Sequence, residues 1–561
     1  MGQIGGEVAA KRRNPSSSVE DRLSALPDDV LLLILLRLET ISEAARTSVL
    51  FVRWRRIWTL LPKLAFNLAP DYHHIRQVLT AAEASALRGI FVVTKDDAPD
   101  FVAAWLPLAA RRLSGDLMYQ NMVSEHSEDD EVEVDGAIPL PCFGNPTRIH
   151  LDLGFLALSL PSSGAFTGIT VLSLKSIRFQ GPCELGDVIS SLRCPGLRKL
   201  RVRDTRGLDR LAVQSKSLLK IDLGYLNGLQ NLSIDASALK KLTLLSNILH
   251  YQPVANISAP QLVFLRWRDA YDPSSVQLGN LGQLQRLSTY FIRVYGQHVD
   301  AYNRGILQLL HQFQDIHNLN IMLSSPQDIG ELQYLMEDIT RLPRVTFLEL
   351  VVFSKGHAFG ASSFHVLRLC TGIRKLSLVL HTPRDLEAHE CPSGCPCDEL
   401  ANWKTGELVL NCLEEVELTN LKGSEFEVTF VEQLFGWATM LQKMQITIAS
   451  WATESMASKL RERLLSFSWP EVRVEFKTQC SAHELPLLVV ESLGTGVEYH
   501  LHTHGLFLGQ KQQHLHLLHA LAHGRSTHFP QPIYYGEIDQ PIYNYKAFGN
   551  WEMEMGIGIR K

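Results

Sequence analysis

The chain has 561 residues, of which 45% are apolar and 20% are charged, so we expect two or more folded units or one elongated repeat array. Its 54 basic and 59 acidic residues give a net charge of -5, which offers no overall positive potential for nucleic acid. Nine cysteines are too few for a secreted disulfide scaffold, and the longest apolar run near the start, Val30–Leu36, is far shorter than the roughly 20 residues of a membrane span. We therefore expect an intracellular protein, cytoplasmic and/or nuclear, with neither nucleic acid nor a membrane as a partner.

A polar leader precedes the first predicted helix. Residues 1–20 are predicted to be disordered. A helix is predicted from Asp28, because its carboxylate can cap a helix and Val30–Leu38 follow without a breaker. Apolar residues cover nearly the whole circumference of this helix, and a segment of about 40 residues cannot bury two faces of one helix by itself. Something else is expected to cover the second face.

Two more short helices are predicted before Pro62. Ser42 can cap one across Glu43–Phe51, and the next carries apolar residues at helical spacing from Trp54 to Leu61. The sequence therefore predicts a three-helix unit over residues 21–64.

Residues 21–64 resemble a plant-type F-box, through the segments Leu26–Leu31, Ala45–Leu50, Arg53–Trp58 and Leu61–Pro62. In that family the domain binds a Skp-family adaptor. The resemblance implies that the adaptor covers the second face by contacting these residues: Leu26, Pro27, Val30, Ile34, Leu35, Leu38, Val49 and Trp54. The alternative is an isolated helical bundle that packs on the rest of the chain.

After this segment the pattern apolar-x-x-apolar-x-apolar recurs ten times. Its copies begin at these residues: Ile169, Leu197, Leu218, Leu239, Leu262, Ile316, Val345, Ile373, Leu413 and Leu441. The starts at 197, 218, 239 and 262 are 21, 21 and 23 residues apart, and those at 345 and 373, and at 413 and 441, are 28 apart. These periods lie in or near the range of leucine-rich repeats.

Each copy predicts a short parallel strand whose alternate apolar residues point into a continuous core, with a helix or loop returning the chain. An Asn three residues after the last apolar position occurs only at Asn247, so irregular turns and a distorted horseshoe are expected. The predicted fold is α/β: a three-helix F-box followed, over 65–385, by an irregular leucine-rich-repeat solenoid, a curved parallel sheet with helices on its convex side.

One stretch within this domain is strongly acidic. Seven of the 11 residues from Glu125 to Asp135 are acids. A solvated flexible loop is favoured over a cation site, because the spacing lacks the Gly turn and the terminal Glu of a calcium loop.

An insertion between the copies at Ile373 and Leu413 contains His389, Cys391, Cys395 and Cys397, which are ligand types that zinc accepts. The spacing C-x3-C-x-C is not a common zinc pattern, and two prolines stiffen the segment. A structured loop with reduced thiols is therefore favoured, and no metal or other cofactor is predicted.

The same insertion carries a second resemblance. Cys391–Trp403, Leu413–Leu418, Gly423, Glu427 and Leu441–Met444 are similar to plant F-box proteins that end in an FBD-type region, in the cereal-like order F-box, repeats, FBD. The resemblance implies an FBD-like region over 386–477 that continues the repeats. It implies no catalytic chemistry.

The last segment, 478–561, is rich in histidine. Nine histidines lie between 481 and 561, and His500, His502 and His504 would share one face of a strand and so could bind a metal. No Cys or carboxylate completes a ligand set, so an atypical, poorly ordered tail is favoured over a metalloenzyme site.

No motif for a phosphate-binding loop, a nucleophile elbow or a zinc protease occurs in the sequence. The resemblances imply a non-catalytic, substrate-recognition subunit of an SCF-type cullin–RING ubiquitin ligase. Its F-box would bind a Skp-family adaptor, and through it the cullin and RING subunits, while the repeats bind an unknown target protein. The alternative is a non-ligase interaction scaffold that uses the F-box only for docking.

Overall fold

The computed structural model describes residues 26–38, 40–49, 52–68, 71–84, 87–123, 136–145, 147–245, 254–297, 301–381, 395–399, 401–450 and 452–477. The predictions for the leader, the acidic stretch, Asn247, His389, Cys391 and the histidine-rich tail lie outside these residues. The chain divides into two units, of which 28–494 contains all the described residues except Leu26 and Pro27.

The amino-terminal helices of the larger unit are short. They are α1 (Asp28–Leu35), α2 (Ile41–Arg46) and α3 (Trp54–Ile57), with 3-10 turns η1 (Thr47–Val49) and η2 (Trp58–Leu60). The helix predicted to reach Leu38 ends three residues earlier. The predicted cap of the second helix was wrong: Thr40 accepts the hydrogen bond from the Glu43 backbone N–H, while the Ser42 hydroxyl lies 3.1 Å from His74 Nε2.

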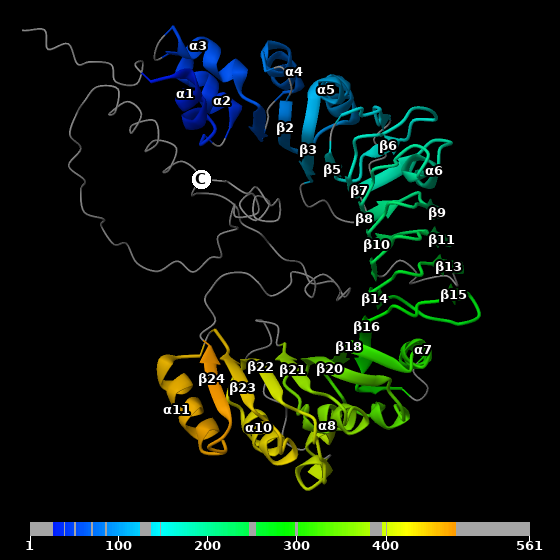
Figure 1. Ribbon diagram of the computed structural model, residues 1–561, viewed down its shortest axis with the longest axis vertical. Coiled ribbons are helices and arrows are strands. Elements are labelled where there is room, and N and C mark those ends of the chain that lie inside the picture. The colour runs from blue at the N-terminus through cyan, green and yellow to red at the C-terminus, as the bar shows by residue number, and fades with distance from the viewer. Residues whose placement is uncertain are drawn as a thin grey trace, which may run out of the picture. The chain divides into compact units, whose positions relative to one another are not determined.

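One long parallel sheet follows (Figure 1). Its strands pair in this order: β1 (Lys63–Asn67), β2 (Leu87–Lys95), β3 (Leu113–Met122), β5 (Arg148–Asp152), β7 (Val171–Gln180), β8 (Lys199–Arg206), β10 (Lys220–Leu226), β12 (Lys241–Leu245), β14 (Phe264–Arg268), β16 (Arg286–Arg293), β18 (Asp315–Ser324), β20 (Arg344–Phe353), β21 (Lys375–Leu380), β22 (Glu415–Leu421), β23 (Lys443–Ile448) and β24 (Arg473–Lys477). Two short strands, β4 (Ala137–Pro139) and β6 (Ala157–Ser159), pair alongside β7. Parallel pairing throughout confirms the predicted solenoid sheet.

The strands are held in register by one row of apolar side chains, the core ladder. It comprises Leu64, Ile90, Leu117, Ile149, Leu172, Leu200, Ile221, Leu242, Leu265, Leu287, Leu319, Leu348, Leu376, Val416, Met444 and Val474, each paired with the next. Every member is buried except Val474, which lies on β24 and is partly exposed. Because side chains alternate along a strand, this row places one face of every strand in the core.

Helices cover the core face of the sheet in the first and last repeats (Figure 1). They are α4 (Tyr72–Ala81), α5 (Pro99–Arg112), α6 (Leu185–Ile189), α7 (Ala301–Leu310), α8 (Gly360–Leu369), α10 (Glu425–Trp437) and α11 (Glu454–Leu465). A four-residue helix α9 (Pro396–Glu399) and two 3-10 turns, η3 (Met336–Asp338) and η5 (Ala401–Lys404), lie in connections, and β17 (Tyr295–Gly296) pairs antiparallel with β19 (Gln333–Tyr334).

The central repeats depart from the expected helical cover. There the chain returns through β9 (Arg210–Gln214), β11 (Asn231–Asp235), β13 (Val254–Ser258) and β15 (Val276–Leu278), which form a second parallel sheet. Successive ladder residues are only 21 to 23 positions apart from Leu200 to Leu287. After two strands and two turns, too few residues remain for a helix, so these repeats close with strands.

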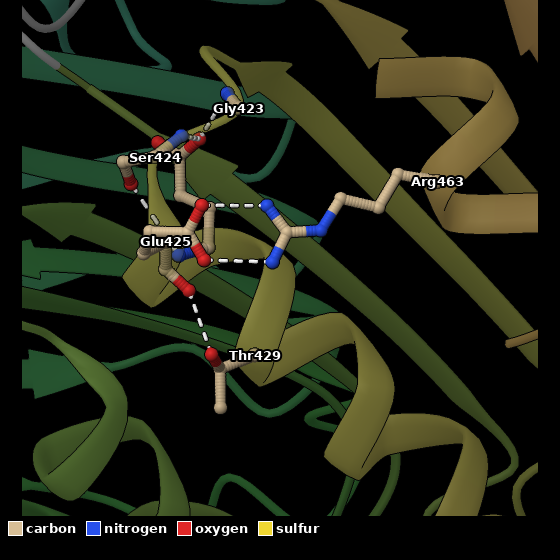
Figure 2. Close-up of polar contacts among 6 residues, drawn as sticks. Gly423, Ser424, Glu425, Thr429 and Arg463 are labelled. Atoms are coloured by element: carbon tan, nitrogen blue, oxygen red, sulfur yellow. Dashed lines mark hydrogen bonds and ion pairs between the residues drawn. The ribbon is translucent and has the colours of Figure 1, made fainter. Parts of the chain in front are cut away.

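The carboxy-terminal repeats continue the ladder through β22, β23 and β24, and Figure 2 shows the start of α10. Ser424 caps α10 by accepting from the Glu427 N–H at 3.4 Å, and Glu427 Oε2 accepts from the backbone N–H groups of Lys422, Gly423 and Ser424 at 2.8, 2.7 and 3.2 Å. Burial raises the pKa of Glu427, and these three N–H groups oppose that rise.

A bidentate ion pair joins α10 to α11. Arg463 donates to both carboxylate oxygens of Glu425 at 2.6 and 2.7 Å (Figure 2). The pair is solvent-exposed, so its contribution to stability is small, and the position of α10 depends mainly on its cap and on its buried apolar face.

We predict that Leu242→Asp lowers the free energy of unfolding by about 3 kcal/mol or more, because it places an unpaired carboxylate inside the core ladder. Chemical denaturation measures the change. The control is Lys240→Asp, an exposed position just before the same strand, which should shift stability by about 0.5 kcal/mol or less. Equal midpoints for the two variants would contradict the buried register of β12.

We predict that Ser424→Ala destabilises the protein by about 1 kcal/mol, because the Glu427 N–H loses its capping acceptor. Ser424→Asp keeps an acceptor at the cap and should remain close to the unmodified protein. Denaturation midpoints of the two variants test the cap, and a neutral Ser424→Ala would show that the hydroxyl contributes nothing.

Candidate functional site

The predicted adaptor-binding residues, which lie on or next to the amino-terminal helices, are exposed, partly buried or fully buried. Pro27 is exposed and Val49 is 86% exposed. Leu26, Val30, Ile34 and Leu38 are partly buried.

Two of the predicted residues are buried. Leu35 and Trp54 are 2% and 0% exposed, because both pack inside the three-helix unit itself. Leu35 lies on the same face of α1 as Leu31, four residues earlier, which is also fully buried. Neither Leu35 nor Trp54 belongs to a surface that a partner can reach in this structure.

Three exposed apolar residues were missed. Leu33, Leu36 and Val52 are 62%, 39% and 77% exposed. The helical period could have found the first two, since positions 33 and 36 share the face of the helix opposite Leu31 and Leu35. We define the exposed apolar surface as Leu33, Leu36, Val49 and Val52.

The three-helix unit is fastened directly to the first repeats. The Thr59 carbonyl accepts from the backbone N–H groups of Glu83 and Ala84, at 2.6 and 3.2 Å. Arg56 Nε pairs with Glu83 Oε2 at 2.9 Å. Strand β1 begins three residues after η2 ends, at Lys63. The unit therefore packs on the rest of the chain, as the alternative expected, and yet leaves the exposed apolar surface uncovered.

The sheet face opposite the core ladder carries a concentration of positive charge over β8 to β16. We define the basic face as Lys199, Arg201, Arg203, Lys220, Lys241, Arg266, Arg268 and Arg286. These residues alternate with the ladder positions along their strands, so they share one side of the sheet. No helix of the residues that the structure describes covers this side (Figure 1).

Asp222 lies within the basic face and pairs with two of its arginines, and Glu349 acts on Arg266 and Arg268 from the same side of the sheet. Arg203 Nη2 donates to Asp222 Oδ1 and Oδ2 at 3.0 and 3.1 Å, and Arg201 Nε donates to Oδ2 at 3.2 Å. Asp222 is only 5% exposed, so its carboxylate is held by these arginines and is not available to a partner. These two carboxylates cannot balance the eight cations of the basic face, which leaves net positive charge.

The pKa values of three basic groups in this region are lowered, first by burial and then by neighbouring cations. Burial, with Lys220 and Arg266 nearby, lowers the pKa of Lys241. Burial, aided by Arg266, lowers the pKa of Arg268 to about 10. His150, which belongs to the same row as Arg201, has its pKa lowered to about 4 by burial and by Arg201 and Arg148. The neighbouring cations thus add to burial in disfavouring further positive charge there.

An apolar cluster adjoins the basic face along the same side of the sheet. It consists of Phe291, Met322, Val351, Phe353 and Val379. Arg268 Nη2 lies 3.5 Å from Met322 Sδ and so connects the two regions. Met322, Val351 and Phe353 are buried, so only Phe291 and Val379 present partly exposed apolar area beside the charge.

Two of the weak metal candidates, Cys395 and Cys397, are brought together with a histidine that sequence reasoning missed. Their Sγ atoms lie 3.5 and 3.8 Å from His357 Nδ1. All three residues are buried, and their ligand atoms lie within 4.8 Å of one another. No sequence signal marked His357, since it stands 38 residues before Cys395.

Among the described residues, no helix is long and apolar enough to cross a membrane.

Comparison with known proteins assigns the amino-terminal helices. Residues 23–65 match the F-box domain. A 50-residue stretch is 50% identical to an F-box protein of Arabidopsis thaliana, covering 9% of this chain and 10% of the relative. Over longer spans the chain is 24% identical to a second Arabidopsis F-box protein, covering 76% of this chain and 88% of the relative. It is also 24% identical to an Arabidopsis F-box/FBD/LRR-repeat protein, covering 80% and 93%.

The F-box match, together with a parallel sheet built from in-register repeats, defines an F-box/leucine-rich-repeat protein. Since the similarity extends through the carboxy-terminal repeats, the chain is a plant F-box/LRR protein with an FBD-like region.

Proposed function

We propose that this chain is the substrate-recognition subunit of an SCF-type cullin–RING ubiquitin ligase. The F-box binds a Skp-family adaptor and, through it, the cullin and RING subunits, while the repeats hold a target protein. The chain performs no catalysis. It raises the local concentration of a target lysine near the ubiquitin-conjugating enzyme, and it acts in the cytoplasm and/or the nucleus.

The observation that carries this proposal is the exposed apolar surface of the F-box. Val49 and Leu33 are 86% and 62% exposed, although the same helices fully bury Leu31, Leu35 and Trp54. Exposed apolar groups concentrated on a unit this small indicate an interaction site. The F-box match supplies the partner class, a Skp-family adaptor.

The target-binding surface that we propose is the basic face with its adjoining apolar cluster. Exposed Lys199, Arg201 and Arg286 favour an acidic segment of the target. The partly exposed Phe291 and Val379 would add apolar contact. The net charge of the whole chain is negative, so this attraction is local to the face.

The adaptor test uses the full chain with Pro27→Ala and Val49→Asp combined. Both positions are exposed, so folding should be retained, while adaptor affinity should fall at least about tenfold because two interface anchors are lost. Co-precipitation of adaptor and cullin, followed by titration with purified adaptor, measures the loss. Target binding should survive, because the two surfaces share no residues.

The matched control is Leu192→Asp, which introduces the same charge at a 92% exposed apolar residue far along the chain from the F-box. It should keep full adaptor binding. A folded double variant that retains adaptor and cullin would refute the docking surface. Adaptor binding without any cullin would instead favour the scaffold alternative.

The target test reverses charge on the basic face with Lys199→Glu and Arg286→Glu. Proteins captured by the full chain from plant extract, measured by quantitative mass spectrometry, should lose their acidic members at least about tenfold, since opposed charge is replaced by like charge. Adaptor recovery should not change.

Its control is the double variant Arg210→Glu, Lys216→Glu, which makes the same change in charge at two exposed positions. Arg210 lies in β9, a strand of the second sheet, and Lys216 follows that strand, so neither belongs to the basic face. This control variant should still capture the acidic proteins that the unmodified chain captures. Equal losses in the two variants would show that net charge, rather than the basic face, determines binding.

A further inference from the structure

Three buried side chains meet where the insertion after β21 rejoins the repeats. His357 lies in the connection between β20 and α8, while Cys395 and Cys397 flank the start of α9. Their exposed fractions are 5%, 6% and 4%. None of the three takes part in the proposed adaptor or target surfaces.

Both connections are held in place by other contacts. A turn with positive φ at Lys355 and Gly356, closed by a 3.0 Å hydrogen bond from the His357 N–H to the Ser354 carbonyl, brings the imidazole toward the insertion. Trp403, in η5, packs so closely on Gly360 at the start of α8 that a β-carbon there would lie 2.3 Å from the indole. The residues after α9 are thereby fixed against α8, next to the His357 connection.

The histidine presents a lone pair to both sulfurs. His357 Nε2 lies 3.1 Å from the Gln327 carbonyl oxygen, which can only accept, so Nε2 carries the hydrogen. Nδ1 is therefore the unprotonated nitrogen, and it faces Cys395 Sγ at 3.5 Å and Cys397 Sγ at 3.8 Å. Metal-binding histidines usually donate their other ring N–H to such an acceptor.

These distances match a shared metal ion. Around a tetrahedral zinc ion with bonds of about 2.0 Å to nitrogen and about 2.3 Å to sulfur, nitrogen and sulfur lie roughly 3.5 Å apart. A hydrogen bond alone would use the Nδ1 lone pair for one thiol and leave the other without that acceptor. A zinc ion would use the lone pair and both sulfurs at once.

We propose that His357 Nδ1, Cys395 Sγ and Cys397 Sγ bind one Zn²⁺, with a fourth ligand supplied from outside these three residues. Both thiols lose their protons on binding, and the ion joins the insertion to the connection before α8 across 38 residues. Because the ligands are buried, the ion stabilises the FBD-like end of the repeats and has no catalytic role.

The full chain, purified without added metal and dialysed against a weak chelator, is analysed by plasma mass spectrometry. The Cys395→Ser, Cys397→Ser double variant should bind about one zinc per chain less than the unmodified protein, and His357→Gln should reduce the zinc in the same way. Cys412→Ser and Cys194→Ser remove an exposed and a buried thiol elsewhere, and both should retain it. Zinc held by the histidine-rich tail would persist in every variant and cancel in the comparison.

A second measurement does not depend on the variants folding. Replacing zinc by Co²⁺ in the unmodified chain should produce a thiolate-to-cobalt charge-transfer band, which histidines alone cannot give. Unchanged zinc content in a folded double variant would overturn the proposal. So would a chain that binds no zinc and develops no such band with Co²⁺.

Discussion

Each repeat can bury its apolar side only by stacking on its neighbours, and the core ladder is where that stacking occurs. From Leu64 to Met444 its members are almost completely removed from water, and each lies opposite the next across a parallel strand pair. No single repeat encloses its own core, so the stability of one strand depends on the two beside it. The polar side chains of the opposite face are free to vary, because they contribute little to this stacking.

Repeat length then decides what covers the core. Where ladder residues are 21 to 23 positions apart, the chain returns through β9, β11, β13 and β15, and where the spacing is longer it returns through helices such as α8 and α10. The contact between α6 and β9 joins the two kinds of cover without a break. The basic face lies over these short repeats, so the most compact part of the sheet carries the densest positive charge.

Much of this architecture could be predicted because it rests on local periodicity. Alternation around Leu242 and Leu265 gave both the strands and their inward faces, and the F-box segments gave the first three helices. The rest depends on contacts between distant residues. Leu35 and Trp54 were assigned to a partner because periodicity cannot show which face of an all-apolar helix the neighbouring helices cover. His357 was missed because its meeting with Cys395 depends on how an insertion folds back on the sheet.

The F-box is joined directly to the sheet, because β1 begins only three residues after η2 ends. The Thr59 carbonyl and the Arg56–Glu83 pair connect the last turns of the F-box to the first repeat. Neighbouring strands lie about 4.8 Å apart, so in the proposed ligase a target bound one strand further along the sheet would lie about 4.8 Å further from the F-box. The loss or gain of one repeat during evolution would move the target by one such step and turn it with the twist of the sheet. Repeat number would thus decide which target lysines come within reach, independently of the residues that recognise the target.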